Sequence, residues 1–232
     1  YTSTEFEIGA DFRFFKNRLG IDIAHYNRRT TNDILNAGIS ATSGFGSTSI
    51  NVGELTNRGI ELLLNGVIVE RGNFKWDASL NFSRNISRAE NLGVNAAGDP
   101  IQFLNLEESR VRGGERVRHI LGEQLGMIIG WKHRTNAQGQ KFYDANGYPV
   151  RSAAPEIVGM GRHPISAGLS NQFRYKNISL SFLIDIRQGG SIFSGTNWYA
   201  YRNGLHKETL VGREGDLKIT GVLFDQATNR ET

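Results

Sequence analysis

Apolar and polar residues alternate along several long segments of this chain. The first segment places apolar side chains at every second position from Phe6 to Phe14, with mostly charged residues between them. A period of two residues is typical of a β-strand whose two faces meet different surroundings. The same pattern recurs in further segments, and we predict strands at about 19–28, 60–65, 74–88, 165–175 and 178–187.

The connections between these strands alternate in length. Short turns are predicted near 16–18, 70–73 and 176–177, and long loops at 31–56, 134–163 and after 190. Outer-membrane barrels place short turns on the periplasmic side and long loops outside. To preserve this alternation, we predict one more strand running towards the periplasmic side at 101–111, followed by a turn at Gly113-Gly114. A further strand would return over 117–132. The predicted total is seven or eight strands.

Two fold classes fit such alternation, a soluble antiparallel sandwich and a transmembrane barrel. Three features favour the barrel. The strands reach 11 residues or more, about twice the usual length. The face opposite the apolar one is charged, as a water-filled interior would be. Aromatic side chains near strand ends, at Tyr26, Trp131 and Tyr175, suit the girdles found at membrane interfaces. We therefore predict an all-β, antiparallel transmembrane β-barrel segment with long extracellular loops.

Composition agrees with this fold and excludes some functions. Mean hydropathy is −0.38. The sequence contains no run of about 18 apolar residues, which a membrane-spanning helix would need. Alternation keeps the average hydropathy of a membrane barrel low. The net charge of +4 is spread along the chain, which argues against a nucleic-acid partner. The chain has no cysteine, which excludes disulfides and thiolate metal sites in this sequence.

Several phrases in the sequence resemble one family. The segment N-V-G-E-L-T-N-R-G-I-E-L at Asn51–Leu62 is similar to a phrase of TonB-dependent outer-membrane receptors, above all the SusC/RagA branch of Bacteroidetes. The run 11–27 resembles the preceding strand pair of that family. Residues 173–183, followed by Gly189-Gly190, resemble a hairpin of the same branch, and 139–144 resembles one of its loops. The resemblance covers nearly the whole chain, in order.

This resemblance implies the later part of a 22-stranded barrel in the outer membrane of a bacterium. Residues 1–232 would form one partial barrel domain, without the plug domain, the TonB box and the closing strands. The expected function is TonB-dependent import of an oligosaccharide or a peptide, in contact with membrane lipid, the TonB complex and a SusD-like surface lipoprotein. Polar residues facing the interior would line the passage or contact the plug: Glu61, Asp77, Asn81, Gln172 and Arg174.

Two other functions stay open on the residue pattern alone. A passive porin or structural barrel would alternate in the same way, and the plug and TonB box would distinguish it from a transporter. A soluble carbohydrate-binding β-sandwich is the third reading. It would require the apolar side chains of the strand at 74–88 to lie in a closed core between two sheets.

The sequence offers little covalent chemistry. The glycine-rich segment 44–49 lacks the lysine and the helix start of a phosphate-binding loop. The five histidines show no metal-ligand spacing, and neither Glu107-Glu108 nor Asp216 has a partner at a catalytic spacing. We therefore predict no enzyme activity, no metal and no cofactor.

One loop cluster combines aromatic rings with a cation. Aromatic faces stack on sugar rings, and an arginine offers a fork of donors to carboxylates. The cluster is thus a candidate ligand-binding site, and the alternative is that the loop packs against its neighbours or the girdle. Its members are Trp198, Tyr199, Tyr201 and Arg202.

Overall fold

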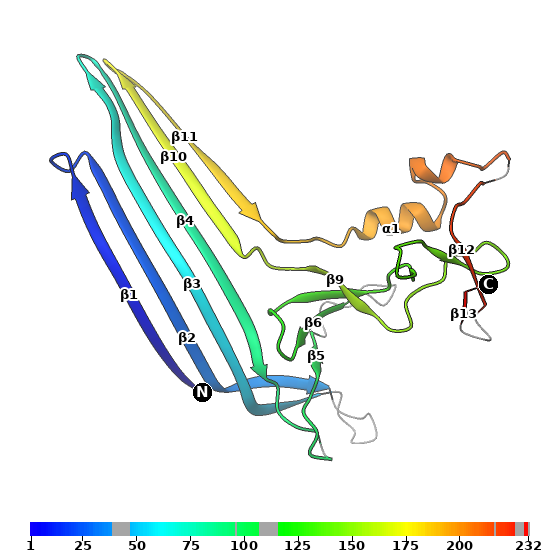
Figure 1. Cartoon of the computed structure of the whole chain (residues 1–232). Helices are drawn as coiled ribbons and strands as arrows, with labels where there is room; N and C mark the ends of the chain where they lie inside the picture. The colour runs from blue at the N-terminus through cyan, green and yellow to red at the C-terminus, as the bar shows by residue number, and fades with distance from the viewer. Residues whose placement is uncertain (39–46, 96, 107–115, 216, 226–229, 232) are drawn as a thin grey trace. The chain divides into compact units, whose positions relative to one another are not determined.

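The computed structural model describes residues 1–38, 47–95, 97–106, 116–215, 217–225 and 230–231 (Figure 1). The chain divides into two compact units. The first comprises Tyr1–Leu106, Arg118–Met127 and Met160–Ser191, and the second comprises Glu107–Val117, Ile128–Gly159 and Ile192–Thr232.

A six-stranded antiparallel sheet dominates the first unit. Its order is β1-β2-β3-β4-β10-β11, so each strand pairs with its nearest neighbours among these six along the chain (Figure 1). All six segments predicted from alternation form strands, which confirms those predictions. Their bounds are β1 Thr2–Phe14, β2 Leu19–Gly38, β3 Ser47–Arg71, β4 Phe74–Asn91, β10 Ile165–Tyr175 and β11 Ile178–Gln188.

The predicted loop at 31–56 is largely strand. β2 and β3 continue to pair from Ile34 with Asn51 as far as Gly38 with Ser47. A bulge at Asn32, whose φ is +56°, shifts the register where this extension begins. Backbone pairing does not depend on side-chain alternation, so the Gly-, Ser- and Thr-rich composition conceals this part of the hairpin. Of the glycine-rich segment 44–49, residues 44–46 lie outside the described residues.

The three short turns gather at one end of the sheet. The turns predicted near 16–18, 70–73 and 176–177 lie at 15–18, 72–73 and 176–177. The carbonyl of Arg18 accepts a hydrogen bond from the Val67 amide, and the Lys176 amide donates to the carbonyl of Asn73. Gly72 adopts φ +56°, a left-handed conformation that glycine reaches without steric cost. The predicted alternation of short and long connections is therefore confirmed at this end.

Among the described residues, no further barrel strand lies between β4 and β10. These strands pair directly, from Arg84 with Ile165 to Phe74 with Tyr175, so residues 92–164 form one connection. This long connection begins and ends at the end of the sheet opposite the short turns. Short and long connections therefore alternate without any extra strands. The predictions of barrel strands at 101–111 and 117–132 were wrong for the described residues, outside which 107–111 lie, and the sheet has six described strands rather than seven or eight.

Short strands occupy this connection instead. They are β5 Phe103–Asn105, β6 Arg116–Ile120, β7 Met127–Gly130, β8 Phe142–Tyr143 and β9 Glu156–Met160. β5 and β6 pair antiparallel. The predicted turn at Gly113-Gly114 lies outside the described residues. A small core forms in the first unit where this connection follows β4, from Ala89, Leu92, Leu104 and Leu125.

The second unit is built of short elements around Phe142, Val150 and Phe224. Strand β8 (Phe142–Tyr143) pairs parallel with β12 (Val222–Asp225), which pairs antiparallel with β13 (Arg230–Glu231). The predicted loop after 190 contains helix α1 (Gly195–Arg202), capped by the Ser194 hydroxyl, and a 3-10 helix at Lys207–Leu210. Within the described residues, no helix has the length and apolar character needed to cross a bilayer.

Candidate functional site: the two faces of the long sheet

Register gives the long sheet two chemically distinct faces. Directly paired residues of an antiparallel sheet share a face. Glu61 pairs with Ala24 and Ser83, and Asp77 pairs with Gln172. The polar face therefore contains, among others, Glu5, Glu7, Asp11, Arg13, Asp22, Arg28, Glu61, Asn65, Lys75, Asp77, Ser79, Asn81, Gln172, Arg174, Asp185 and Arg187. All five residues predicted to face an interior lie on this face.

The opposite face carries an apolar band. In β1, β4 and β11 it runs over nine residues, at 6–14, 74–82 and 178–186. A strand needs about 9–11 residues to cross a bilayer. Members of the band pair across the sheet, as Leu64 with Leu80 and Leu80 with Leu169. We call this surface the apolar band: Phe6, Ile8, Ala10, Phe12, Phe14, Leu19, Ile21, Ile23, Ile60, Leu62, Leu64, Phe74, Trp76, Ala78, Leu80, Phe82, Ala167, Leu169, Phe173, Tyr175, Ile178, Leu180, Phe182, Ile184 and Ile186.

Nothing in the described residues covers the band as a second sheet would. Ile8 is 62% exposed and Leu180 is 61% exposed, although each lies within an alternating pattern. A sandwich would bury such side chains between its sheets. The soluble-sandwich reading therefore fails for this sheet.

The short-turn end of the band is rich in aromatic rings. Trp76 stacks on Phe173 with ring centroids 5.3 Å apart, and Phe173 stacks on Phe182 at 6.0 Å. The Trp76 indole N–H donates to the Asn171 side-chain oxygen at 3.1 Å. Asn171 is a polar residue of β10 that lies among the apolar side chains of the band and is only 5% exposed. The indole N–H provides the hydrogen-bond donor that its buried oxygen needs. Tyr175 lies at this end of the band, as the interface prediction requires.

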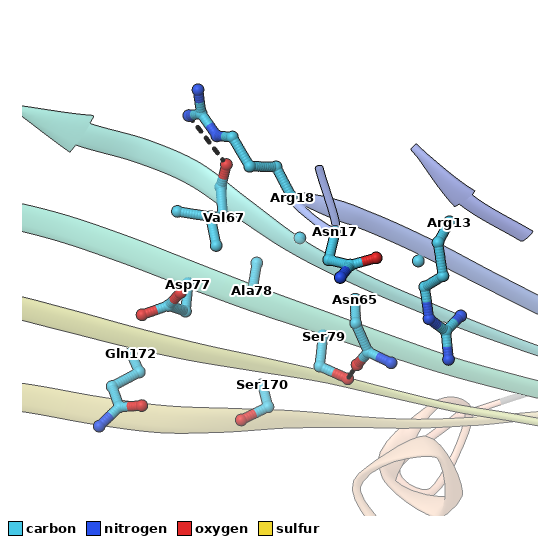
Figure 2. A pocket seen from close by; sticks show the side chains of 12 residues that line it. Arg13, Asn17, Arg18, Asn65, Val67, Asp77, Ala78, Ser79, Ser170 and Gln172 are labelled. Carbon is cyan, nitrogen blue, oxygen red and sulfur yellow. Dashed lines mark hydrogen bonds between the residues drawn. The ribbon is translucent and has the colours of Figure 1, made fainter. Parts of the chain in front are cut away.

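A hollow of about 340 Å³ lies on the polar face near the short turns (Figure 2). Arg13 from β1 and Arg18 from the first turn provide its cations, and Asp77 from β4 provides its anion. Ser79 donates a hydrogen bond to the Asn65 oxygen at 2.7 Å, and Arg18 donates to the Val67 carbonyl. These groups could hold a polar chain segment or a water-rich passage through hydrogen bonds.

Charges on the polar face are mixed in sign. Arg28 donates two hydrogen bonds to one oxygen of Glu5, at 2.7 and 3.0 Å. On β4 and β11, ion pairs form between residues two apart, Lys75 with Asp77 and Arg187 with Asp185. Such pairs are stable only where water or other polar groups solvate them. The polar face is thus suited to an aqueous interior.

Tyr26 belongs to the polar face, so its predicted place in an interface girdle was wrong. It pairs directly with Gly59, and its ring lies so close that a Cβ atom at residue 59 would overlap it. An aromatic ring laid over a cross-strand glycine is a known device for fixing strand register. This contact explains why the phrase N-R-G at 57–59 ends in glycine.

The chemistry of the two faces reverses beyond the apolar band. On the side that carries the band, charged pairs appear, with Arg29 and Glu54 at 2.8 Å. On the other side, the polar face ends in Leu55 and Ala89, which pack in the small core with Leu92. The apolar band therefore ends at this level on the face that carries it.

The predicted loop cluster is positioned by α1. The guanidinium of Arg202 lies 5.3 Å from the Trp198 ring centre, and Tyr199 meets Trp198 edge-on. Tyr201 stacks on His206 and donates a hydrogen bond to Glu208, which raises the pKa of the Tyr201 hydroxyl. Trp198, Tyr199 and Arg202 thus form one contact group, and Tyr201 belongs to another.

Trp131 was also misplaced by the sequence pattern. We predicted it at the end of a barrel strand, but it lies in the second unit beneath the Arg151 guanidinium. Arg134 and Arg151, which the sequence reasoning missed, stack on aromatic rings there. No sequence motif identifies these stacks, because they form between residues up to 90 positions apart.

The described residues contain no group of three metal-ligating side chains. His163 lies beside Gly190 in the first unit, and His133 lies beside Tyr143 in the second. The carboxylates singled out at Glu107-Glu108 and Asp216 lie outside the described residues.

Comparison with known proteins gives a consistent result. The family described as "TonB dependent receptor-like, beta-barrel" matches residues 1–182. TonB-dependent receptor P26 of Formosa agariphila is 26% identical over 211 residues, which cover 83% of this chain and 21% of that protein. TonB-dependent receptor SusC of Bacteroides thetaiotaomicron is 25% identical over 229 residues, which cover 92% of this chain and 21% of that protein. The chain spans about a fifth of the length of these curated relatives.

A solved structure shares the fold. The structure titled "Structure of the RagAB peptide transporter" matches with a TM-score of 0.63 and 22% identity, over 81% of this chain and 21% of that chain. The same assembly in its "open-open" state matches with a TM-score of 0.59.

Proposed function

The chain belongs to the TonB-dependent receptor-like β-barrel family, and from this premise we propose that its protein imports a nutrient across the outer membrane of a bacterium with energy delivered by TonB. The observation that carries the proposal is the division of one sheet into a nine-residue apolar band and a charged opposite face. Lipid would contact the band, and the polar face would line the interior.

The ligand would bind at the extracellular side, where the long connections lie. TonB would then act on a plug domain and open the path along the polar face, past Glu61, Asp77 and Gln172. We propose an oligosaccharide or a peptide as cargo, because the relatives include SusC and a peptide transporter. A SusD-like surface lipoprotein is the proposed extracellular partner.

The proposal contains no chemical step. The family consists of receptors and transporters, and binding and displacement by polar side chains suffice for import. The contact group Trp198, Tyr199 and Arg202, with Tyr201 beside it, remains our proposed ligand contact in the loop after β11.

Uptake in living cells tests this proposal. Cells expressing the full-length receptor are given fluorescent oligosaccharides and peptides too large for general porins, with and without the TonB protein. We expect uptake that requires both the receptor and TonB, and that stops when a protonophore removes the energy source. Uptake that persists without TonB would contradict active import and favour the passive-porin alternative. A small sugar that passes general porins serves as the control for cell integrity.

A further inference from the structure

Three arginines gather on the face of the long sheet that carries the apolar band, at the end of the band. Arg58 lies on β3, and Arg84 and Arg88 lie on β4. Arg58 pairs directly with Ile86, and the other two arginines stand two positions before and after Ile86. Paired residues share a face, and so do residues two apart along a strand. The three side chains therefore surround Ile86 on one surface, which we call the outer arginine patch.

The patch adjoins the apolar band directly. Arg84 pairs with Ile60, the member of the band on β3 that lies farthest from the short turns. On β4, Arg84 is the next residue on the same face after Phe82, the corresponding member of the band. Long arginine side chains near the end of a membrane-spanning segment extend from the apolar layer to the polar headgroups. In the proposed barrel the short turns are periplasmic, so the patch lies in the leaflet that faces the cell exterior.

The spacing of the patch lets two guanidinium groups reach one anion. Diagonal neighbours on paired strands are about 7–8 Å apart, which is within reach of long side chains. Arg58 is the diagonal neighbour of both Arg84 and Arg88, which are about 13 Å from each other along β4. The patch therefore offers two positions for one phosphate group between two arginines. Asn27 pairs with Arg58 from the other side and adds an amide donor on the same face.

The positive charge of the patch is not neutralised by ion pairs. Within the described residues, none of the three guanidinium groups of the patch forms an ion pair. Two carboxylates lie farther along this face, and both are engaged: Glu54 pairs with Arg29 at 2.8 Å, and Glu90 accepts a hydrogen bond from the Thr56 hydroxyl at 2.6 Å. All three arginines are exposed. An anion can therefore approach the patch and is attracted to it.

We infer that the outer arginine patch binds the phosphate group of an anionic lipid in the leaflet that faces the cell exterior. A guanidinium presents parallel N–H donors that match the oxygens of a phosphate. A lipid fits better than a soluble phosphate compound, because its acyl chains would lie along the adjoining apolar band. This inference rests on the proposed place of the barrel in the outer membrane. It goes beyond import, since the proposed path of the nutrient runs along the opposite face.

Native mass spectrometry of the full-length receptor in detergent tests the inference, because it counts the lipids bound to each receptor. The probes are dioleoyl phosphatidic acid, inorganic phosphate, and dioleoylglycerol, which has the same acyl chains without the phosphate. We expect phosphatidic acid to bind at least about tenfold more tightly than either of the other two. Equal binding of phosphatidic acid and dioleoylglycerol would overturn the inference. Inorganic phosphate that binds as tightly as phosphatidic acid would overturn the assignment of a lipid.

Variants locate the lipid on the receptor. Arg58→Gln, Arg84→Gln and Arg88→Gln should each weaken the binding of phosphatidic acid about fivefold, and together about a hundredfold. Lysine at the same three positions keeps the charge and should keep most of the binding. Lys75→Gln removes one charge from the opposite face of β4 and should leave the binding unchanged.

The variants decide the assignment even if one of them does not fold. Should the combined glutamine variant fail to fold, the three single variants decide, because each replaces an exposed side chain. Folded glutamine variants that bind phosphatidic acid as tightly as the unaltered receptor would contradict the assignment to this patch. The same loss in Lys75→Gln as in the single arginine variants would contradict it too.

Lipid binding needs neither TonB nor a nutrient, so the two proposals can fail separately. A receptor that binds phosphatidic acid through the patch but shows no TonB-dependent uptake would contradict only the import proposal. A receptor that imports its nutrient with TonB but binds phosphatidic acid and dioleoylglycerol equally would contradict only the outer arginine patch.

Discussion

At the scale of single residues, one hydrogen bond to a polar side chain contributes to the stability of the apolar band. Asn171 lies within the band, and the Trp76 indole N–H satisfies its side-chain oxygen at 3.1 Å. A buried polar group without a partner costs about 1–3 kcal/mol. The pair should therefore be strongly coupled.

We expect Trp76→Phe to lower the free energy of unfolding by about 1–3 kcal/mol, since the Asn171 oxygen loses its donor. In an Asn171→Leu background the same substitution should cost less, because no polar group is left unpaired. Urea unfolding of the receptor in detergent, arranged as a double-mutant cycle, measures the difference. Equal costs in both backgrounds would show that the hydrogen bond does not contribute.

Gly59 is the second residue whose role is explicit. A methyl group there would overlap the Tyr26 ring, so Gly59→Ala should lower the free energy of unfolding by about 1–3 kcal/mol. Gly66→Ala on the same strand approaches only the flexible end of Ile68 more closely than 3.4 Å, at 3.3 Å, and meets the Arg18 carbonyl and Leu19 at ordinary contact distances, so it serves as the control. The double variant Tyr26→Ala with Gly59→Ala should recover part of the loss. A Gly59→Ala variant as stable as the control would contradict this account of the N-R-G phrase.

At the scale of elements, β6 carries a pH-sensitive contact. Burial first, and the Arg162 guanidinium second, lower the pKa of His119 below its usual 6.5. Neutral His119 accepts a hydrogen bond from the Gly126 amide at 3.3 Å. The unfolded segment binds a proton more readily than the folded one, so stability is present above pH 6.5 and is lost as the pH falls from 6.5 towards the lowered pKa.

Hydrogen exchange of the β6 amides measures this dependence. After correction for the intrinsic rate, protection should decrease as the pH falls from 7.5 to 5.5. His119→Gln does not titrate and should show constant protection over that interval. The same decrease in both proteins would assign the effect to another group.

The apolar band makes a prediction about depth. Leu80 lies within the band and pairs with Leu64 and Leu169, which belong to it too. An arginine on the lipid side of a barrel near the midplane costs about 2–4 kcal/mol. Leu80→Arg should therefore destabilise the receptor in lipid vesicles by about that amount, and Ser79→Arg, on the polar face, by much less. Similar costs at both positions, measured by chemical unfolding, would contradict the assignment of faces.

The elements also show what sequence patterns can and cannot predict. β1, β4, β10 and β11 were predictable because each strand separates lipid-like from water-like surroundings along its length. The extensions of β2 and β3 were not predictable from the sequence. Beyond the apolar band, the two faces of the sheet do not require apolar and polar residues to alternate. The extra strands at 101–111 and 117–132 were wrong because alternation of loops constrains only where a connection starts and ends. Contacts such as Tyr26 with Gly59, or Arg151 with Trp131, depend on register and folding that no local pattern encodes.

At the scale of the whole molecule, the central question is which face of the sheet meets lipid. The described chain has one sheet whose two faces differ along all six strands, and family membership places such a sheet in a barrel. The import path, the ligand contacts and the direction of the loops all depend on this orientation. Transport assays report on it only indirectly.

The most direct test is a scan of β4 with spin labels in the receptor reconstituted in lipid vesicles. This chain has no cysteine, so single cysteines at Trp76, Ala78, Leu80 and Phe82, and at Asp77, Ser79, Asn81 and Ser83, can be labelled one at a time without interference from it. We predict that the first set collides mainly with oxygen dissolved in the bilayer and the second mainly with a water-soluble nickel reagent, alternating at every residue. Equal access to the nickel reagent at both sets would contradict the account.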